Sequence, residues 1–398
     1  MPVTKHVMLI IETSKVYGRS LLKGIGQHAM LHGAWSLFVE ERGLMDSPPK
    51  WLARWRGDGI IFRSTTQSQV DAVLATGLPA VDTNSRVTGH GLPLVYVDEV
   101  GVAQAAVTHF QERNFQNFAF CALEELNWVR WRRQACLECL TSRGFSAQDF
   151  SLPERLSWDR QREQLLRWVV SLPKPVAVLA ANDVCGMRLI DACRSAEIQV
   201  PEDVAVLGVD NDEVMCLLTS PPLASIDLNV QRIGREAALV LDRLMSGEPQ
   251  SADPVWIKPL GVVPRQSTDV VALDDPDMVK AISFIRKNAC REINVENVLA
   301  EVAISRATLE RKFARLIGRL PKEEILRIRL DRVKRLLAQT DLTLPHIAKQ
   351  TGFKTHSHMS VAFKRETGQT VGEYRQSHRM GGIACSLPAC PARNCRRT

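Results

Sequence analysis

The sequence lacks long apolar runs and the familiar catalytic signatures. No stretch approaches the 18 or more consecutive apolar residues that a membrane-spanning helix requires. The Walker, metalloprotease and nucleophile-elbow motifs are all missing. We therefore expect a protein that is neither membrane-embedded nor an enzyme, and we expect no cofactor and no metal ion.

The N-terminus and the cysteines point to a cytoplasmic location. The first residues, MPVTKHVMLIIETSK, hold a short apolar run closed by Glu12, which predicts a buried strand rather than a signal peptide. Most of the ten cysteines lie in apolar stretches, which is typical of reduced thiols. Redox or metal chemistry is a weak alternative for the C-x-x-C pair and for the spaced cysteines of the tail, which are Cys136, Cys139, Cys385, Cys390 and Cys395.

Charge is distributed unevenly along the chain. Residues 1–275 carry 27 Lys and Arg against 33 Asp and Glu, a net charge of −6. Residues 276–380 carry 21 against 11, a net charge of +10, within a total of +7. A basic segment on an acidic body favours a polyanion partner for that segment, although a solvated basic face would show the same balance.

The first two-thirds of the chain alternates β-rich apolar runs with helical patterns. This alternation predicts parallel sheets with right-handed crossovers, and about 265 residues fit two similar α/β lobes better than one sheet. Ligands of such folds bind at the carboxyl ends of strands, here in the cleft between lobes. The predicted strands are 6–11, 35–39, 59–62, 78–82, 94–97, 117–122, 175–180 and 204–208, and the predicted helices include 17–32, 99–113, 129–143, 161–171, 184–196 and 231–245.

The stretch VALDDPD, residues 271–277, ends this alternation, and the residues beyond it show helical patterning only. We predict an α/β domain over 1–270 and a linker over 271–279. An all-α domain with two helix-turn-helix motifs should occupy 280–379. The tail, 380–398, has no periodicity and is expected to be disordered.

The first helix-turn-helix motif is predicted over Val295–Phe313. A short apolar helix precedes a turn at Ala303–Ser305, and the Ser305 hydroxyl can cap a second helix. Leu309 and Phe313 form the inward stripe of that helix. Its outward residues are then Arg306, Ala307, Glu310 and Arg311.

A second motif is predicted over Leu344–Phe363. Ala348 lets two helices approach, and Gly352 permits a left-handed turn between them. The N-terminal half of the second helix of such a motif enters the major groove of DNA. In this chain that half carries His356, Ser357, His358 and Ser360.

A basic helical pattern over 322–339 joins the two motifs and would set their spacing. An all-helical basic bundle with surface histidines is the alternative. Two motifs joined by a helix, together with the net charge of +10, favour double-stranded DNA as the partner.

Residues 280–377 resemble the AraC/XylS-type DNA-binding domain, most clearly in RVKRLLAQTDLTLPHIAKQTGF and FKRETGQTVGEYR. The resemblance implies that the outward residues of the first motif face one major groove and those of the second motif the next. Ala303 replaces a turn glycine, at a cost of about 1 kcal/mol if its φ is positive. Val361 and Val371 replace the usual arginine and proline.

Residues 179–213 and the following SPPLASID resemble the effector-binding core of LacI-type regulators and periplasmic sugar-binding proteins. Asn182 with Asp183, and Asp210 with Asn211, each end a predicted strand and should open on the cleft. Their carboxylates and amides can bond vicinal hydroxyls, or they can simply cap the next helices. The resemblance implies sugar contacts for Asp210, Asn182 and Arg132.

Further effector candidates come from two helix starts. Trp128 and Trp131 lie close to Arg132, and the apolar face of a sugar could stack on one of the indoles. Ser14 and Arg19 follow the first predicted strand and are added by the resemblance.

The two resemblances together imply a sequence-specific transcription regulator of sugar catabolism, with activation as its expected mode. The effector would be a pentose, with D-xylose as first candidate, and cleft closure would shift the population of states. A homodimer on operator half-sites, working with RNA polymerase, is expected. The alternative is a sugar-binding protein or carbohydrate enzyme with an accessory helical domain.

Overall fold

The computed structural model describes residues 4–32, 35–84, 86–152, 156–249, 253–270, 275–340 and 342–379. The chain divides into two compact units, residues 1–272 and 273–398. The predicted linker lies partly outside the described residues, and the predicted disordered tail, 380–398, lies wholly outside them. Within the described ranges, no helix combines the length and the apolar composition that crossing a membrane requires.

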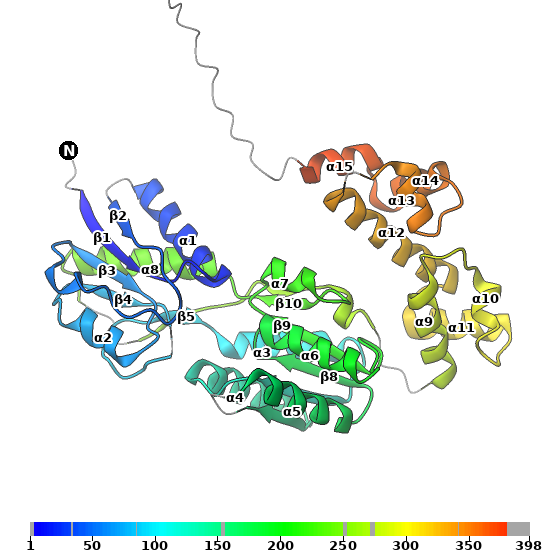
Figure 1. Ribbon diagram of the computed structural model, residues 1–398, viewed down its shortest axis with the longest axis horizontal. Helices are drawn as coiled ribbons and strands as arrows, with labels where there is room; N and C mark the ends of the chain where they lie inside the picture. The colour runs from blue at the N-terminus through cyan, green and yellow to red at the C-terminus, as the bar shows by residue number, and fades with distance from the viewer. Residues whose placement is uncertain are drawn as a thin grey trace, which may run out of the picture. The chain divides into compact units, whose positions relative to one another are not determined.

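The N-terminal lobe of the first unit is built on a parallel sheet (Figure 1). Buried side chains alternate between its two faces, as the period of two in a strand requires. Val7 and Leu9 pack in one core cluster, while Met8 and Ile10 pack in another. The strands, in spatial order, are β2 (Trp35–Val39), β1 (Lys5–Ile10), β3 (Gly59–Phe62) and β4 (Ala80–Asp82), with the helices α1 (Val16–His32), η1 (Leu52–Arg54) and α2 (Gln67–Leu74).

The second lobe contains six strands, of which five run parallel and the edge strand β12 runs antiparallel to its neighbour. Phe118 and Phe120 face the helices α3 (Glu99–Gln111) and α4 (Asn127–Ser142). Ala119 and Cys121 face α5 (Trp158–Ser171) and α6 (Asp183–Ser195) on the other side. In spatial order the strands are β12 (Gly261–Val263), β10 (Ala224–Asp227), β9 (Val204–Val209), β8 (Val176–Ala180), β6 (Asn117–Ala122) and β7 (Ala147–Ser151), and α7 (Glu213–Leu218) and η2 (Gln266–Thr268) complete the lobe.

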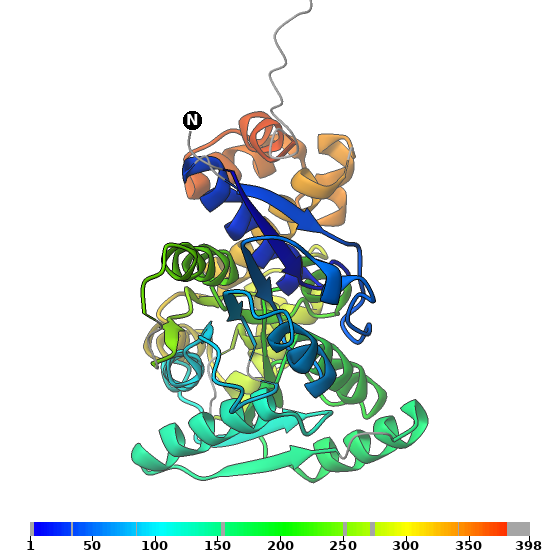
Figure 2. The same cartoon turned by 90° about the vertical axis from the view of Figure 1, so that its left-hand side faces the viewer.

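The chain crosses between the two lobes three times. β5 (Val95–Val97) leads into α3, β10 leads into α8 (Val230–Met245), and β11 (Val255–Ile257), which pairs with β5, leads into β12. The helix α8 returns to the N-terminal lobe and packs on α1, so a green helix lies among blue elements in Figures 1 and 2.

Two glycines allow this close contact between α1 and α8. A Cβ at Gly24 would lie 1.9 Å from the carbonyl oxygen of Gln231, and one at Gly234 would lie 2.3 Å from that of Leu21. The backbones of the two helices therefore touch directly, which only glycine permits at these positions.

Over its described residues the second unit is wholly helical. It consists of α9 (Pro276–Asn288), α10 (Val295–Leu299), α11 (Arg306–Ile317), α12 (Pro321–Gln339), α13 (Leu344–Gln350), α14 (His356–Thr367) and α15 (Val371–Arg379). The pairs α10–α11 and α13–α14 are the two predicted helix-turn-helix motifs, and α12 is the predicted connecting helix. The 19 residues of α12 make it about 28 Å long.

Candidate effector cleft and DNA-binding surface

A cleft of about 740 Å³ is lined by residues from both lobes of the first unit. Its walls lie just beyond the carboxyl ends of parallel strands, where α/β folds place their ligands. Tyr17 and Arg63 come from the N-terminal lobe, and Asn182 and Asp210 come from the second lobe. The volume is in the range of small-molecule sites.

Asp210 lines this cleft directly after β9. The residue is half-buried, and its carboxylate accepts no hydrogen bond from any described residue. Burial raises the pKa of this carboxyl to about 6, while the charges of Arg132 and Arg63 act in the opposite direction. Its φ of 111° is rare for any residue with a Cβ, and such strain gathers at functional sites.

Helix capping does not account for Asp210. The helix α7 begins after Asp212, whose side chain accepts a hydrogen bond from the Met215 backbone N–H. The alternative role that the sequence allowed for Asp210 therefore belongs to Asp212.

Arg132 is almost completely buried, with 2% of its side chain exposed. It forms a bidentate ion pair with Glu99, at 2.7 and 2.9 Å, and donates to the Ala181 carbonyl at 2.6 Å. The Trp128 ring lies 5.2 Å from its guanidinium carbon. A guanidinium has five N–H donors, so two remain for a ligand or for Asp210.

Two predicted residues follow the neighbouring strand β8: Asn182, which caps a helix, and Asp183, which is buried. Asn182 caps α6 by accepting from the Cys185 N–H at 2.9 Å, and its amide nitrogen has no partner among the described residues. Asp183 accepts from the Ser225 hydroxyl at 2.5 Å and from the Asp212 N–H at 2.7 Å. Burial raises the pKa of Asp183 to about 7, with Asp210 adding to the shift.

Asn211 does not line the cleft, contrary to the prediction from its strand end. Its left-handed φ of 52° follows the unusual φ of Asp210, and the side chain is held elsewhere. The side-chain oxygen of Asn211 accepts from Arg265 at 2.8 Å, and its amide nitrogen donates to Asp227 at 3.3 Å. A strand-end position predicts the loop, but the backbone turn decides which way the side chain points.

The other predicted effector residues separate into two groups. Ser14, Arg19 and Trp128 line the cleft. Trp131 instead packs against Tyr96 and Trp256, with ring centroids 6.4 and 6.1 Å apart. Only one of the two indoles is therefore available for stacking on a ligand in the cleft.

Among the cleft residues that the sequence did not predict, two carry buried polar atoms without a partner. The Tyr17 hydroxyl and the Arg63 Nε are buried without a hydrogen-bond partner among the described residues. Arg63 pairs with Glu12 and lies over the Tyr17 ring, 4.3 Å from its centroid. Arg63 directly follows the predicted strand 59–62, so the rule that selected Asp210 could have found it.

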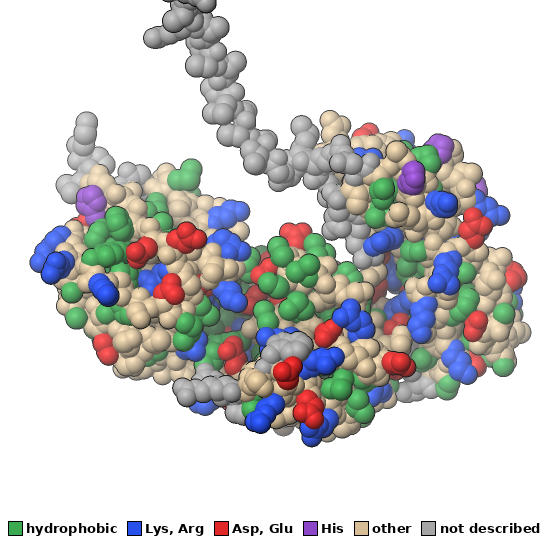
Figure 3. Space-filling view, in the orientation of Figure 1, with side chains coloured by type: hydrophobic (Ala, Val, Ile, Leu, Met, Phe, Trp, Pro, Cys, Tyr) green, Lys and Arg blue, Asp and Glu red, His purple; other side chains and the backbone are tan. Residues whose placement is uncertain are grey.

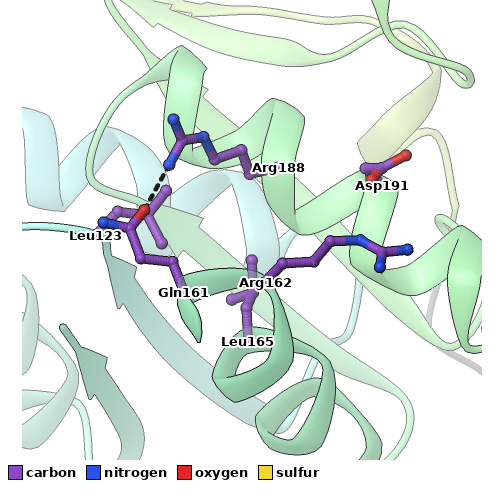
Figure 4. Close-up of a pocket in the computed structure, with 6 residues that line it drawn as sticks. All are labelled: Leu123, Gln161, Arg162, Leu165, Arg188 and Asp191. Atoms are coloured by element: carbon purple, nitrogen blue, oxygen red, sulfur yellow. Dashed lines mark hydrogen bonds between the residues drawn. The ribbon is translucent and has the colours of Figure 1, made fainter. Parts of the chain in front are cut away.

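Side chains from α5 and α6 that line the cleft contact each other. Arg188 donates to Gln161 at 2.6 Å, beside a small pocket that Leu123 also lines (Figure 4). All three residues line the large cleft as well, so the contact between α5 and α6 forms part of its rim.

The helix α11 presents a basic exposed face. Ser305 caps it by accepting from the Thr308 N–H, as predicted. Arg306 pairs with Glu296 at 2.7 Å and with Glu310 at 3.0 Å. Ala307 and Arg311 are exposed, and the Arg311 guanidinium has no partner among the described residues.

The helix α14 presents His356, Ser357 and His358, all exposed at its N-terminal end. Ser360 is half-buried and donates to the His356 carbonyl at 2.9 Å, so its hydroxyl is already engaged. Val361 is 70% exposed on the same helix. The face of the helical unit seen in Figure 3 carries histidine, lysine and arginine side chains together with acidic and hydrophobic ones.

The turns of the two motifs differ in the way they reverse the chain. Ala303 does not have a positive φ, so the cost considered for it does not arise. Gly352 has the predicted left-handed conformation, with φ of 74°. The core residues Phe353, Met359 and Phe363 are buried, as their spacing predicts.

Each of the two units matches a known protein family. Residues 107–268 match a periplasmic binding protein-like domain, and residues 298–377 match a helix-turn-helix domain. These matches, on a two-lobed α/β unit followed by a helical unit, define the class: a DNA-binding transcription regulator in which a periplasmic-binding-protein-like domain precedes an AraC-type helix-turn-helix domain.

Among particular proteins, the chain is similar over nearly its whole length to regulators of one operon. It is 28% identical to the xylose operon regulatory protein of Haemophilus influenzae, covering 93% of this chain and 97% of that protein. The protein of the same name from Escherichia coli K12 is 28% identical, with 93% and 96% covered. A solved structure of the xylose-binding transcription activator XylR superposes with a TM-score of 0.76 at 26% identity, covering 94% of this chain and 98% of that one.

Proposed function

We propose that this chain is a cytoplasmic, homodimeric activator of sugar-catabolism genes that binds D-xylose in the cleft. The observation that carries the proposal is the similarity to the xylose regulators over 93% of the chain, which spans both the cleft and the helical unit. The hydrogen-bonding groups left open in the cleft fit a polyhydroxylated ligand.

Asp210 is the central acceptor in this proposal. Its carboxylate would accept from two sugar hydroxyls, because it has no hydrogen bond from any described residue. The remaining Arg132 donors, the Arg63 Nε and the Tyr17 hydroxyl would complete the polar contacts. Trp128 would stack on an apolar face of the sugar.

Regulation would follow from the two-lobed construction. A ligand that touches both lobes binds the closed state more tightly and shifts the population toward it. Closure would change the arrangement of the two subunits, and with it the arrangement of their DNA-binding units at operator half-sites. RNA polymerase would then be recruited.

The rival class is a sugar-binding protein or carbohydrate enzyme with an accessory helical domain. It is not favoured, because the similarity to transcription regulators continues through the helical unit. We propose accordingly that the chain acts by binding, without catalysing a reaction.

A thermal-shift screen against pentoses and hexoses tests the proposed effector. D-xylose should raise the melting temperature, since a ligand bound only by the native state stabilises it in proportion to the logarithm of its concentration over Kd. A shift with another sugar and none with D-xylose would change the effector, and no shift with any sugar would remove it.

Substitution on the recognition helices should separate base contacts from phosphate contacts. His356→Ala and Arg311→Ala should each weaken binding to the cognate site by about 1–3 kcal/mol and leave the melting temperature unchanged, since both side chains are exposed. Fluorescence anisotropy with cognate and scrambled duplexes gives the measurement. Equal losses on the two duplexes would assign these residues to the phosphate backbone.

Sugar affinity should depend on pH through Asp210. Hydroxyl donors favour the ionised carboxylate, so affinity should be constant well above pH 6 and should fall by up to about tenfold per unit below it. Calorimetric titrations with D-xylose between pH 5 and 8 provide the measurement. Asp210→Asn should remove this dependence, whereas an unchanged pH profile in that variant would assign the titration to Asp183.

A further inference from the structure

The turn between α9 and α10 contacts two later parts of the chain, the helix α12 and the turn after α13. Arg329, on α12, donates from Nε to the Ala289 carbonyl at 2.6 Å. Its Nη2 donates to the carbonyls of Arg291 and Ile293 at 2.8 and 3.0 Å. One side chain thus donates to three backbone carbonyls of the turn, and the first of them, that of Ala289, stands at the end of α9, where helix carbonyls lack partners within the helix.

The second helix-turn-helix motif meets the same turn. The Arg329 guanidinium carbon lies 5.8 Å from the ring centroid of Phe353, within cation–π distance. Beside it, a Cβ at Gly352 would lie 2.6 Å from the carbonyl oxygen of Arg291 and 2.9 Å from that of Ala289. The turn of the second motif is therefore packed against the turn that opens the first.

We propose that the contacts of Arg329 and Gly352 with the turn between α9 and α10 hold the two helix-turn-helix motifs in one fixed relative position. These contacts would then fix the spacing between the base pairs that α11 and α14 contact. Arg329 is a positioning residue, because its guanidinium is occupied by backbone carbonyls. Lysine could not replace it, since a single ammonium cannot match the planar fork that reaches three carbonyls. The inference rests on the assignment of α11 and α14 as the helices that enter the grooves.

The test measures how much DNA affinity is lost when the spacing between the two contacted DNA segments is changed. A residue that only stabilises the domain would not alter this loss. A site selected from random DNA by the full chain is compared with versions in which about 5 base pairs, or half a helical turn, are inserted between its two contacted segments. The wild-type chain should lose about a hundredfold in affinity on the insertion, as the contacts of one motif are lost.

Arg329→Met and Gly352→Ala should bind the selected site more weakly than the wild type and lose less than about tenfold on the same insertion. Arg332→Met is the matched control, because Arg332 is exposed on the same helix and its substitution removes the same charge. It should keep the full wild-type discrimination. If Arg329→Met does not fold, Arg329→Lys replaces it with the same expectation.

Two results would overturn the proposal. Folded Arg329 variants that keep the hundredfold discrimination would show that this side chain only stabilises the domain. A wild-type chain that tolerates the insertion would show that the motifs do not act as a rigid pair. Complete failure of the wild type to select any site would instead contradict the proposed DNA function.

Discussion

Asp210→Asn should reduce the affinity for D-xylose a hundredfold or more while leaving DNA binding in the absence of sugar intact. A charge-assisted hydrogen bond contributes about 1.5–3 kcal/mol, and the proposed contact contains two of them. Asparagine keeps the shape of the side chain and tolerates positive φ better than alanine does, which matters at a φ of 111°. Calorimetry with the purified full chain gives the affinity.

The stability of the same variant should change in the opposite direction. The folded-state pKa of Asp210 is raised from 3.8 to about 6, so the ligand-free protein loses stability as the pH rises between these two values and keeps that loss at higher pH. Asp210→Asn should therefore melt higher than the wild type at pH 8 without sugar. Asp210→Gly should also fold well and fail to bind, since glycine accepts this φ.

Asp71→Asn is a suitable control, because Asp71 is exposed on α2 and its side chain bonds the neighbouring Gln67. It should retain wild-type sugar affinity. A stable Asp210→Asn protein that binds D-xylose as the wild type does would exclude Asp210 from the site.

The affinity for DNA should fall steeply as the salt concentration rises. If the helical unit neutralises about six phosphates, its affinity should fall about a thousandfold between roughly 50 and 200 mM monovalent salt, because counterions are released from DNA on binding. The net charge of +10 on residues 276–380 supplies the cations. Anisotropy titrations across this range, plotted on logarithmic axes, give the slope.

The fragment 276–380 should fold alone and show nearly the same slope, because the core of the helical unit is its own. Lys364→Gln on α14 should reduce the slope by about one if this lysine contacts a phosphate. Lys23→Gln, exposed on α1 in the first unit, should leave it unchanged. A flat salt response would contradict the electrostatic basis of the DNA surface.

Long apolar runs made most of the fold predictable. The run that became β9 is buried at every position, and burial on both sheet faces leaves an unbroken apolar signal. The eight predicted strands each lie within two residues of β1 to β6, β8 or β9. The strand β10, ASID, pairs with β9 but was not predicted, because its four residues hold no apolar run. The edge strand β7, AQDFS, was missed because it is half-exposed and lacks alternation. The three-residue strands β11 and β12 are too short to carry a period.

The site was predictable to the level of the loop and no further. The predicted strand ends identified Asn182 and Asp210. The Asn211 side chain turns toward Arg265 because two consecutive residues have positive φ, and no pattern in the sequence predicts this. Likewise, the unpaired Tyr17 hydroxyl becomes visible only once the surrounding side chains are placed.

The three crossings between the lobes have a mechanical consequence. They are tied to one another, since the Leu260 N–H donates to the Asp227 carbonyl and the Asp98 N–H to that of Ile257. Asn229 and Gly261, both with positive φ, lie in two of these crossings. We therefore expect the lobes to open by rotation about a line through the three crossings, because a twist of one lobe against the other would break these hydrogen bonds. The Asp227 carboxylate accepts from the Asn211 amide and from the Asn229 N–H. The loop that carries Asp210 is therefore hydrogen-bonded to one of the three crossings.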